Sequence, residues 1–406
     1  MSDAWSIKPV GPRVSELEKS TLPAGLAEDH GAFPFYCSSP QVRRINRAIT
    51  STPSILMGTG GVATVHLGQG SFAYSTDTWA FTIADPFTDL RFLYRQLQHR
   101  LPEIDYAGFG GSGLRHLNKD HVRSLALPVP PLPEQSAIAR ILDVLDISIR
   151  ETEAVIAKLK AVKRGLLHDL LTRGIDANGE LRPPQAEAPH LYKQSPLGWI
   201  PRGWEPLTLE QVTDTPICYG IVQVFGFVPN GVPVLAIKDL NGDYATGIHR
   251  TALRIDAAYP RSRVRPGDVL LSIKGTLGKV GVVPSHFTGN VSRDIALIRP
   301  APTVRSQYLA QMLQSTVGQK LLSLAQVGTT RGEISIAPLR RIVVPLPDIE
   351  EQQRLEASLE ASEGRIKQEE LTLQKLRSEK AGLMDDLLTG RVRVTPLLAA
   401  EQQGGA

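Results

Sequence analysis

One segment of the sequence, Gly108 to Gly113, has the glycine spacing of a nucleotide-binding loop. Such a loop follows a buried strand and opens a helix, so that its backbone amides can meet a phosphate. Residues 101–107 do not read as a buried strand, and the related segment 328–333 keeps only two of the glycines. A flexible loop, or one that lets a partner approach closely, is therefore the favoured interpretation.

Other catalytic arrangements are also missing from the sequence. The run from Gly275 to Val280 lacks the spacing and the Ser/Thr of a phosphate loop. No Ser/His/Asp or paired-carboxylate pattern repeats, and the Asn/Asp-Pro-Pro-aromatic signature of an adenine methyltransferase is absent. Cys37 and Cys218 stand alone, without histidines at metal-ligand spacing. We predict a non-catalytic chain that binds no metal or cofactor of its own.

Charge is distributed unevenly between the two halves. Residues 198–347 hold 16 Lys and Arg against 9 Asp and Glu, whereas residues 1–128 hold 12 against 11. A basic half fits a polyanionic partner, although a solvated basic surface fits equally well. The sequence has neither an apolar run of about 18 residues nor a secretory signal, so we expect a cytoplasmic protein without a membrane span.

An internal repeat is the strongest pattern. An offset of 217 residues aligns five pairs of segments without gaps, namely 58–61 with 275–278, 75–77 with 292–294, 125–130 with 342–347, 134–135 with 351–352, and 169–172 with 386–389. Five matches at one offset indicate a duplication. The parts before Gly58 and Gly275 match poorly, so we expect a shared framework with divergent N-terminal parts, which equally fits an old duplication with drift.

Each copy ends in a long amphipathic stretch that begins after a proline-rich strand end and stops near Gly174 or Gly390. Apolar residues recur there at alternating steps of four and three, as in a coiled-coil seam. The seam consists of Ile138, Leu142, Leu145, Ile149, Ile156, Leu159, Leu166, Leu170, Leu355, Leu359, Ile366, Leu373, Leu376, Leu383 and Leu387. The polar residues that interrupt the seam are Thr152, Lys163, Ser362, Glu369 and Lys380. We predict that the two helices pair antiparallel, because two equal units favour a pseudo-twofold arrangement.

The globular parts combine short β-rich runs with later helical stretches. Strands are expected at 54–57, 264–273 and 280–283, and helices at 90–101 and 307–324. The predicted fold class is α/β (α+β), with two globular domains, a pair of long antiparallel coiled-coil helices and an internal pseudo-twofold repeat. The expected boundaries are 1–130 (first domain), 131–174 (first helix), 175–197 (linker), 198–347 (second domain), 348–390 (second helix) and 391–406 (tail).

Several of these segments resemble the conserved regions of type I restriction-modification specificity subunits. They are the junctions 128–135 and 345–352, the helix ends Leu170-Leu171-Thr172 and Leu387-Leu388-Thr389-Gly390, and the opening 198–204 of the second domain. The resemblance covers nearly the whole chain. The first domain departs from it, because it begins without the corresponding Pro-x-x-Trp lead-in.

The resemblance implies that the globular domains are target-recognition domains, each reading one half of a split double-stranded DNA sequence. The helices would set the spacer and dock two methyltransferase subunits. S-adenosylmethionine, Mg and ATP would be bound by those partners and by added restriction subunits. The alternatives are the specificity subunit of a fused methylase-nuclease system, a free-standing DNA-binding regulator, and an enzyme with an unrecognised site.

Candidate DNA contacts follow from the side chains that reach base edges and phosphates. They are Tyr36, Arg43, Arg44, Arg47, Thr59, Lys274, Thr276, Lys279, Arg293 and Arg331. The three arginines at 43–47 equally fit a solvated helix face. The glycines around Lys274 equally fit a plain tight turn.

Overall fold

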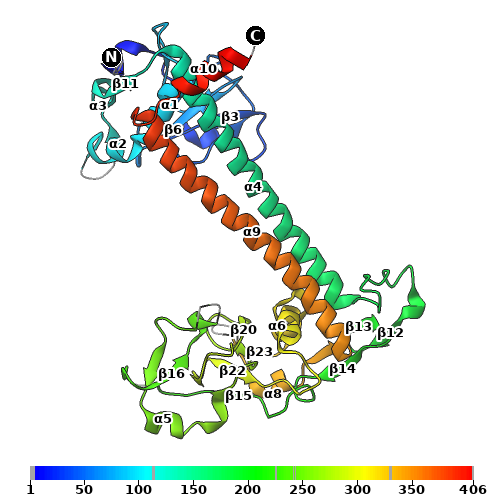
Figure 1. Cartoon of the computed structure of the whole chain (residues 1–406). Coiled ribbons are helices and arrows are strands. Elements are labelled where there is room, and N and C mark those ends of the chain that lie inside the picture. Colours follow the sequence, from blue (N-terminus) through cyan, green and yellow to red (C-terminus); the bar gives the residue numbers. More distant parts are fainter. Residues whose placement is uncertain are drawn as a thin grey trace. The chain divides into compact units, whose positions relative to one another are not determined.

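The computed structural model describes residues 5–111, 115–224, 226–240, 242, 244–328 and 332–404. The chain forms two compact units, Met1–Val155 with Glu369–Ala406, and Ile156–Gln368. Helices α4 (Leu132–Thr172) and α9 (Ile349–Leu388) each contribute one part to either unit. We call these assemblies unit 1 and unit 2, and their elements are labelled in Figure 1.

Unit 1 contains two sheets of more than two strands, besides the two-stranded pairs β1–β11 and β9–β10. Strand order is β2-β8-β5-β6 in the antiparallel sheet and β4-β3-β7 in the second, where β3 and β7 run parallel. The fully buried strand β5 lies at the centre because Ser54-Ile55-Leu56-Met57-Gly58 is almost entirely apolar. The strands are β1 (Ser6–Pro9), β2 (Val14–Glu16), β3 (Phe33–Tyr36), β4 (Arg43–Ile45), β5 (Ser54–Gly58), β6 (Val65–Gly68), β7 (Ala73–Tyr74), β8 (Thr78–Ile83), β9 (Phe109–Gly110), β10 (His116–Leu117) and β11 (Ala126–Val129).

Unit 2 repeats this topology. Its sheets have the orders β15-β22-β19-β20 and β17-β16-β21-β18, and β16 and β21 run parallel. The expected strand at 264–273 is two strands, because the chain turns at Gly267 (φ +86°). The strands are β12 (Tyr192–Ser195), β13 (Gly198–Pro201), β14 (Glu205–Thr208), β15 (Cys218–Tyr219), β16 (Val232–Leu235), β17 (His249–Thr251), β18 (Arg263–Val264), β19 (Val269–Ser272), β20 (Val280–Val282), β21 (Gly289–Val291), β22 (Ile295–Ile298), β23 (Gln326–Val327), β24 (Glu333–Ile334) and β25 (Val343–Leu346).

Short helices cover the sheets of each unit. The side chain of Asp89 caps α1 by accepting hydrogen bonds from the backbone amides of Arg91 and Phe92. The remaining α-helices are α1 (Leu90–His99), α2 (Leu101–Ala107), α3 (Lys119–Ser124), α5 (Leu253–Ala257), α6 (Ser306–Gln314), α7 (Thr316–Leu324), α8 (Ile336–Arg340) and α10 (Thr395–Gly404).

Within each unit, α4 and α9 lie side by side and run antiparallel (Figure 1). In unit 1, Lys380 pairs with Asp146 at 2.6 Å and Arg377 with Glu153 at 2.7 Å. In unit 2, Lys163 pairs with Glu363 at 2.6 Å. The predicted antiparallel coiled coil is confirmed, and two of its polar seam lysines, Lys163 and Lys380, each reach a carboxylate of the opposite helix.

The predicted seam is the least exposed line along both helices. All fifteen of its apolar side chains are buried or half-buried, while most residues beside them are exposed. Ile138 and Leu142 join Leu387 and Leu388 in one cluster of unit 1. Leu170 joins Leu355 and Leu359 in a cluster of unit 2. Burial of this seam supplies the hydrophobic driving force for pairing.

A buried glutamine connects the start of each long helix to its globular domain. The Gln135 amide donates to the carbonyls of Phe87 and Pro130 at 2.8 Å, and its oxygen accepts the amide of Asp89. Gln352, its counterpart at the 217-residue offset, donates to Thr303 and Pro347 and accepts the amide of Arg305. These hydrogen bonds pair backbone carbonyl and amide groups that would otherwise be buried without a partner where each long helix meets its globular domain.

The glutamate before each glutamine is also buried, and it pairs with an arginine that follows the other long helix. Arg393 donates to Glu134 in unit 1, with nitrogen–oxygen distances of 3.0 and 2.6 Å. In unit 2, the NH2 nitrogen of Arg182 donates to Oε2 of Glu351 at 2.9 Å. We call these two bidentate pairs the clamps. Each clamp joins the end of one long helix to the beginning of the other within a single unit.

The segments that follow the two long helices contribute buried side chains to their units. Ile175, Ala188 and Tyr192 are buried, and the backbone amide of Arg182 bonds Gly174 O at 3.2 Å. After α9, Val394 is buried against the cluster of unit 1. Both segments are therefore packed through a few apolar side chains, although their overall composition is typical of a linker.

A tryptophan covers the glycine that ends each long helix. Trp204 lies against Gly174 (φ +65°) in unit 2, and Trp5 lies against Gly390 (φ +77°) in unit 1. Strands β1 and β14, which follow these tryptophans, pair with β11 and β25 in the same register. Trp5 is thus the counterpart of Trp204. The first domain has the tryptophan of the lead-in, although it lacks the proline-containing sequence before it.

Candidate nucleic-acid interface

A turn and a neighbouring hairpin form one edge of the larger sheet in unit 1. The turn at 59–64 connects β5 to β6, and the hairpin strands are β9 and β10. The amide of Leu117 donates to Thr59 O at 3.0 Å, and the amide of Gly61 donates to Arg115 O at 3.0 Å. The Thr59 amide in turn donates to Asp77 O at 2.9 Å. Three separate segments therefore meet at this turn–hairpin edge.

Unit 2 has the same edge. Its turn at 273–279 connects β19 to β20, and the amide of Ile334 in β24 donates to Ile273 O at 2.9 Å. The Ile273 amide donates to Asp294 O at 2.8 Å. Ser272 fixes the turn, because its hydroxyl donates to Thr276 O at 2.6 Å and accepts the amide of Lys279 at 2.8 Å.

Strand register corrects the alignment of the two turns. Gly58 lies opposite Thr78, and Ser272 lies opposite Ile295. The structural counterpart of Thr59 is therefore Ile273 rather than Thr276. Glycines at both turns had suggested an offset of 217 residues. In β5 and β19, however, the offset between equivalent residues is three residues smaller.

Four of the predicted contacts come together at the turn–hairpin edge of unit 2. Thr276 and Lys279 are exposed on the turn, and Lys274 Nζ lies 3.0 Å from Glu333 Oε2 of the hairpin. Arg293 is exposed beside Asp294, which holds the turn through its carbonyl. A positive, glycine-containing edge can approach a polyanion closely. Arg331 lies outside the described residues.

The predicted contacts of unit 1 separate into different environments. Tyr36 is only 7% exposed, stacks edge-on against Phe72 and donates to Leu67 O at 3.3 Å, so it belongs to the core. Arg43 and Arg44 are exposed on strand β4, and Arg47 follows it, so the helix-face interpretation is wrong. Pairing of Phe33 with Ile45 fixes that strand. The Arg44 NH2 nitrogen donates to Ala32 O at 2.8 Å and supports a loop.

Thr59 is half-buried at the edge of unit 1, beside a residue that the sequence did not single out. The Ser38 hydroxyl accepts the amide of Thr59 at 3.0 Å and donates to Asp77 O. A cavity of about 320 Å³ opens next to this turn, and His116, Lys19 and Lys119 line it. No periodic or spacing signal identifies these residues, because they converge only through strand pairing.

The N-terminal parts of the two domains share a backbone framework although their sequences do not match. The Val10 amide donates to Leu125 O, and the Leu209 amide donates to Ile342 O. Likewise, the Ser75 amide donates to Tyr36 O and the Ser292 amide to Leu235 O, all at similar lengths. From Val10 to Tyr36, equivalent residues of the two units are thus separated by 199 residues in the sequence. The shared framework therefore extends into the N-terminal part of each domain, where the two sequences do not match.

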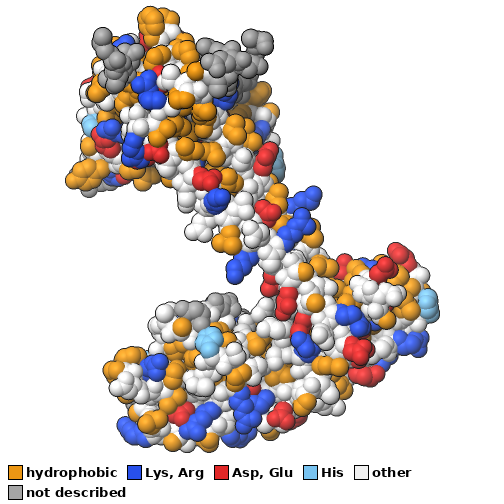
Figure 2. Space-filling view, in the orientation of Figure 1, with side chains coloured by type: hydrophobic (Ala, Val, Ile, Leu, Met, Phe, Trp, Pro, Cys, Tyr) orange, Lys and Arg blue, Asp and Glu red, His pale blue; other side chains and the backbone are white. Residues whose placement is uncertain are grey.

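Divergence is concentrated between β3 and β5 of unit 1, and between β16 and β19 of unit 2. We call residues 37–53 and 236–268 the variable segments. Each variable segment contains one equivalent strand, because β4 and β17 both pair antiparallel with the strand that precedes them. The longer segment of unit 2 adds α5 and β18. Lys and Arg side chains gather along the lower edge of unit 2 in Figure 2.

Within the described residues, no group of three or more His, Cys, Asp or Glu side chains could hold a metal ion. None of the helices in the described part of the chain is both long and apolar enough to cross a membrane.

Comparison with known proteins gives one family. The type I restriction modification DNA specificity domain matches residues 14–161 and 201–376. The chain is 28% identical over 274 residues to the EcoBI specificity subunit of Escherichia coli, which covers 65% of this chain and 57% of that protein. It is 28% identical over 299 residues to the MjaVIII specificity subunit of Methanocaldococcus jannaschii, covering 71% and 67%. The match thus spans little more than half the length of the Escherichia coli relative.

Two solved structures share the fold. One is the S subunit of a type I restriction-modification system from M. genitalium, with a TM-score of 0.58 and 16% identity, covering 96% of this chain and 97% of that one. The other comes from a study of assembly and conformational transition of the type I R-M system, with a TM-score of 0.59 and 18% identity, covering 97% and 99%. With the repeated domain–helix architecture and the family match over both units, the chain belongs to the type I restriction-modification DNA specificity domain family.

Proposed function

We propose that this chain is the DNA-specificity subunit of a type I restriction-modification system, and that it performs no catalysis itself. The observation that carries the proposal is the occurrence of one domain–helix assembly twice, with the same turn–hairpin edge in each unit. Two related readers in one chain suit a DNA target with two specified halves. A protein that recognises a single undivided site would not need a second globular domain.

In this proposal each globular domain reads one half-site, and the turn–hairpin edge faces DNA. Exposed Lys279, Thr276 and Arg293 supply the hydroxyl and cationic groups that contact base edges and phosphates. In unit 1, the exposed Arg43 and Arg47 and the half-buried Thr59 are the corresponding candidates. Sequence discrimination resides mainly in the variable segments, because the remaining framework is common to both domains.

The helices in this proposal hold the enzymatic partners. Val144, Ile147, Val155 and Val162 are exposed on α4. Hydrophobic side chains also interrupt the charged surface of the helices in Figure 2. Such residues along one helix suit the docking of partner helices. The partners would be two methyltransferase subunits with S-adenosylmethionine, joined by restriction subunits that use Mg and ATP.

Co-purification with the methyltransferase tests this proposal most simply. The chain should form a stable complex with two methyltransferase chains, and the complex should methylate a bipartite sequence that the methyltransferase alone leaves unmodified. Replacing Val155 and Val162 by Asp should weaken the complex, whereas Arg365→Asp, an exposed change on α9, serves as the surface control. A lone monomer that methylates DNA would refute the proposal.

Two related functions give different outcomes in the same experiment. The specificity subunit of a fused methylase-nuclease system would purify with a single chain that carries both activities. A free-standing regulator would bind DNA without an enzyme partner and leave no methylation at its site.

A further inference from the structure

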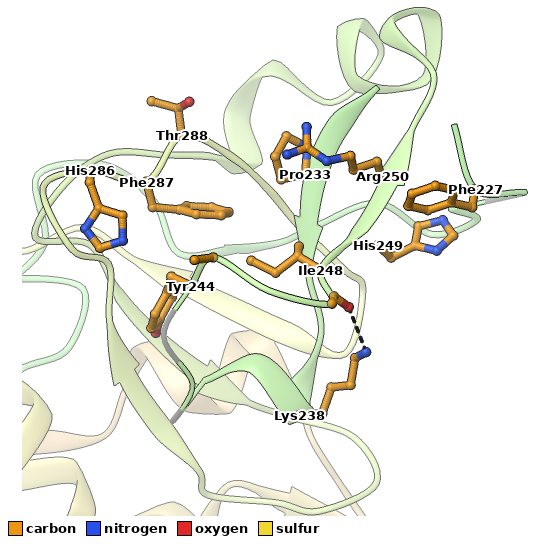
Figure 3. A pocket seen from close by; sticks show the side chains of 12 residues that line it. Phe227, Pro233, Lys238, Tyr244, Ile248, His249, Arg250, His286, Phe287 and Thr288 are labelled. Carbon is orange, nitrogen blue, oxygen red and sulfur yellow. Dashed lines mark hydrogen bonds between the residues drawn. The ribbon is translucent and has the colours of Figure 1, made fainter. Parts of the chain in front are cut away.

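A cavity of about 720 Å³ lies in unit 2, mostly within the variable segment 236–268 (Figure 3). Phe227 and Pro233 line one side, residues 244–250 form another wall, and His286 to Thr288 complete it. Its volume falls in the range of small-molecule binding sites. Unit 1 has a shorter segment at this position, residues 37–53.

The charged side chains that line the cavity are cationic. Lys238 Nζ donates to Gly247 O at 3.1 Å, and Arg250 NH1 donates to Gly231 O at 3.1 Å. Both of these partners are neutral carbonyls. His249 and His286 also line the cavity, and none of its described lining residues is Asp or Glu. The carboxylate of the neighbouring Asp239 is buried and accepts the backbone amide of Ala236 at 2.8 Å. The cavity is therefore electrostatically suited to an anion.

Aromatic rings line the same cavity. Phe227 is 59% exposed, and its ring meets His249 edge-to-face at 5.9 Å, as Figure 3 shows. Nε2 of His249 is buried without a hydrogen-bond partner among the described residues. On the opposite side Tyr244 packs on Phe287 at 5.7 Å and donates to Leu240 O at 3.2 Å. Burial raises the pKa of Tyr244 to about 12.

The cavity also adjoins the turn–hairpin edge. A side-chain carbon of Ile237 lies 3.7 Å from the position that a Cβ on Gly275 would take, and Lys238 follows directly. The Tyr244 hydroxyl approaches Gly281 of β20 just beyond the turn. A strand of nucleic acid that contacts Thr276 and Lys279 would therefore pass close to the cavity.

We infer that this cavity binds one nucleotide, with its phosphate near Arg250 and its ring or sugar against Phe227, while Lys238 lies toward the opposite end of the cavity (Figure 3). An exposed aromatic ring in a cavity lined by cations can bind a nucleotide through stacking and charge. The inference rests on the proposed function where it takes the nucleotide to be part of bound DNA. A free nucleotide offers the same chemistry, so the experiment distinguishes the two sources.

The test uses the full-length chain and measures fluorescence anisotropy of a labelled duplex over a range of salt concentrations. Lys238→Gln with Arg250→Gln should flatten the slope of log affinity against log salt by about 0.9 for each lost phosphate contact. Phe227→Ala should weaken binding by about 5- to 150-fold through lost stacking, and Phe227→Trp should restore it. Lys320→Gln, an exposed change on α7 that does not line the cavity, should leave the affinity within about twofold of the wild-type chain.

A second arm replaces the duplex with a labelled mononucleotide and uses the same variants. Losses confined to this arm would assign the cavity to a free nucleotide, whereas losses with the duplex assign it to DNA. Unchanged binding of both probes by folded cavity variants would overturn the inference. A wild-type chain that binds no duplex, even with its methyltransferase partner, would instead count against the proposed function.

Discussion

The two units share a framework but differ in what is inserted into it. Both have a buried Gln at the start of a long helix, a clamp, a tryptophan over a glycine and a turn–hairpin edge. They differ in the variable segments, in net charge and in the cavity of unit 2. The comparison teaches that features shared by both units maintain the assembly. Features present in only one are the candidates for specificity.

Breaking a clamp should have the largest effect on stability, and only in its own unit. Glu351→Ala should destabilise unit 2 by about 3–5 kcal/mol, because it leaves the Arg182 guanidinium half-buried and the Ile175 amide without its acceptor. Glu134→Ala should cost less in unit 1, since Arg393 is more exposed than Arg182. Hydrogen exchange, read separately for each unit, measures both effects.

Glu350→Ala provides the matched control, since this neighbouring side chain is 84% exposed. It should change stability by no more than about 0.5 kcal/mol. Equal losses of protection in both units after Glu351→Ala would show that the clamps do not act within single units.

Alanine at the two helix-ending glycines should have the next largest effect. At Gly174 a Cβ would lie 2.2 Å from Glu351 Oε1 and 2.6 Å from the Trp204 ring, and φ is +65°. We expect a loss of about 2–4 kcal/mol from backbone strain and crowding together. At Gly390 the nearest atom is 3.0 Å away, on the Trp5 ring, so about 1–2 kcal/mol is expected.

Chemical denaturation of Gly174→Ala and Gly390→Ala compares the two ends, with Gly203→Ala as the control. Gly203 has open space around it and no positive φ. If Gly390→Ala proved the more destabilising of the two, the tighter packing of unit 2 at this position would be disproved.

The ion pairs of the coiled coil should show a smaller effect that depends on pH. Burial opposes ionisation of Asp146, but its bonds to Lys380 and Arg95 outweigh burial and lower its pKa. A lowered folded pKa stabilises the fold above the unfolded value of about 4, and this contribution disappears as the pH falls through the folded value. Asp146→Asn should therefore cost about 1–2 kcal/mol at neutral pH and progressively less in acid.

Glu363→Gln is the counterpart in unit 2 and should cost about 0.5 kcal/mol or less, because that carboxylate is 53% exposed. Urea unfolding at several pH values measures both variants. A pH-independent cost of Asp146→Asn would contradict an electrostatic role for this residue.

The sequence predicted the helices and their seam well, because a 3.5-residue period is a local signal that burial of Ile138, Leu142 and Leu359 directly reflects. It missed the match of Val10 with Leu209, which is carried by backbone hydrogen bonds rather than side-chain identity. The clamps were also missed. Arg182 and Arg393 lie far along the chain from their partners, and pairing over such separations leaves no local pattern.

The candidate site was predicted only in part. Glycines pointed to the turn of unit 2, where Lys274, Thr276 and Lys279 do lie together. Tyr36 was predicted to contact DNA, but strand pairing places it in the core. The cavity had no sequence signature, since Phe227, Lys238 and His286 converge from three separate segments.

Genome-wide mapping of methylated sites after a domain exchange tests the central claim most directly. Residues 1–128 would be replaced by the first variable domain of a related chain, with the helices and unit 2 left unchanged. We predict that one half of the methylated sequence changes, while the other half and the spacer between them stay the same. If both halves changed, or neither did, the two units would not be independent readers of a split target.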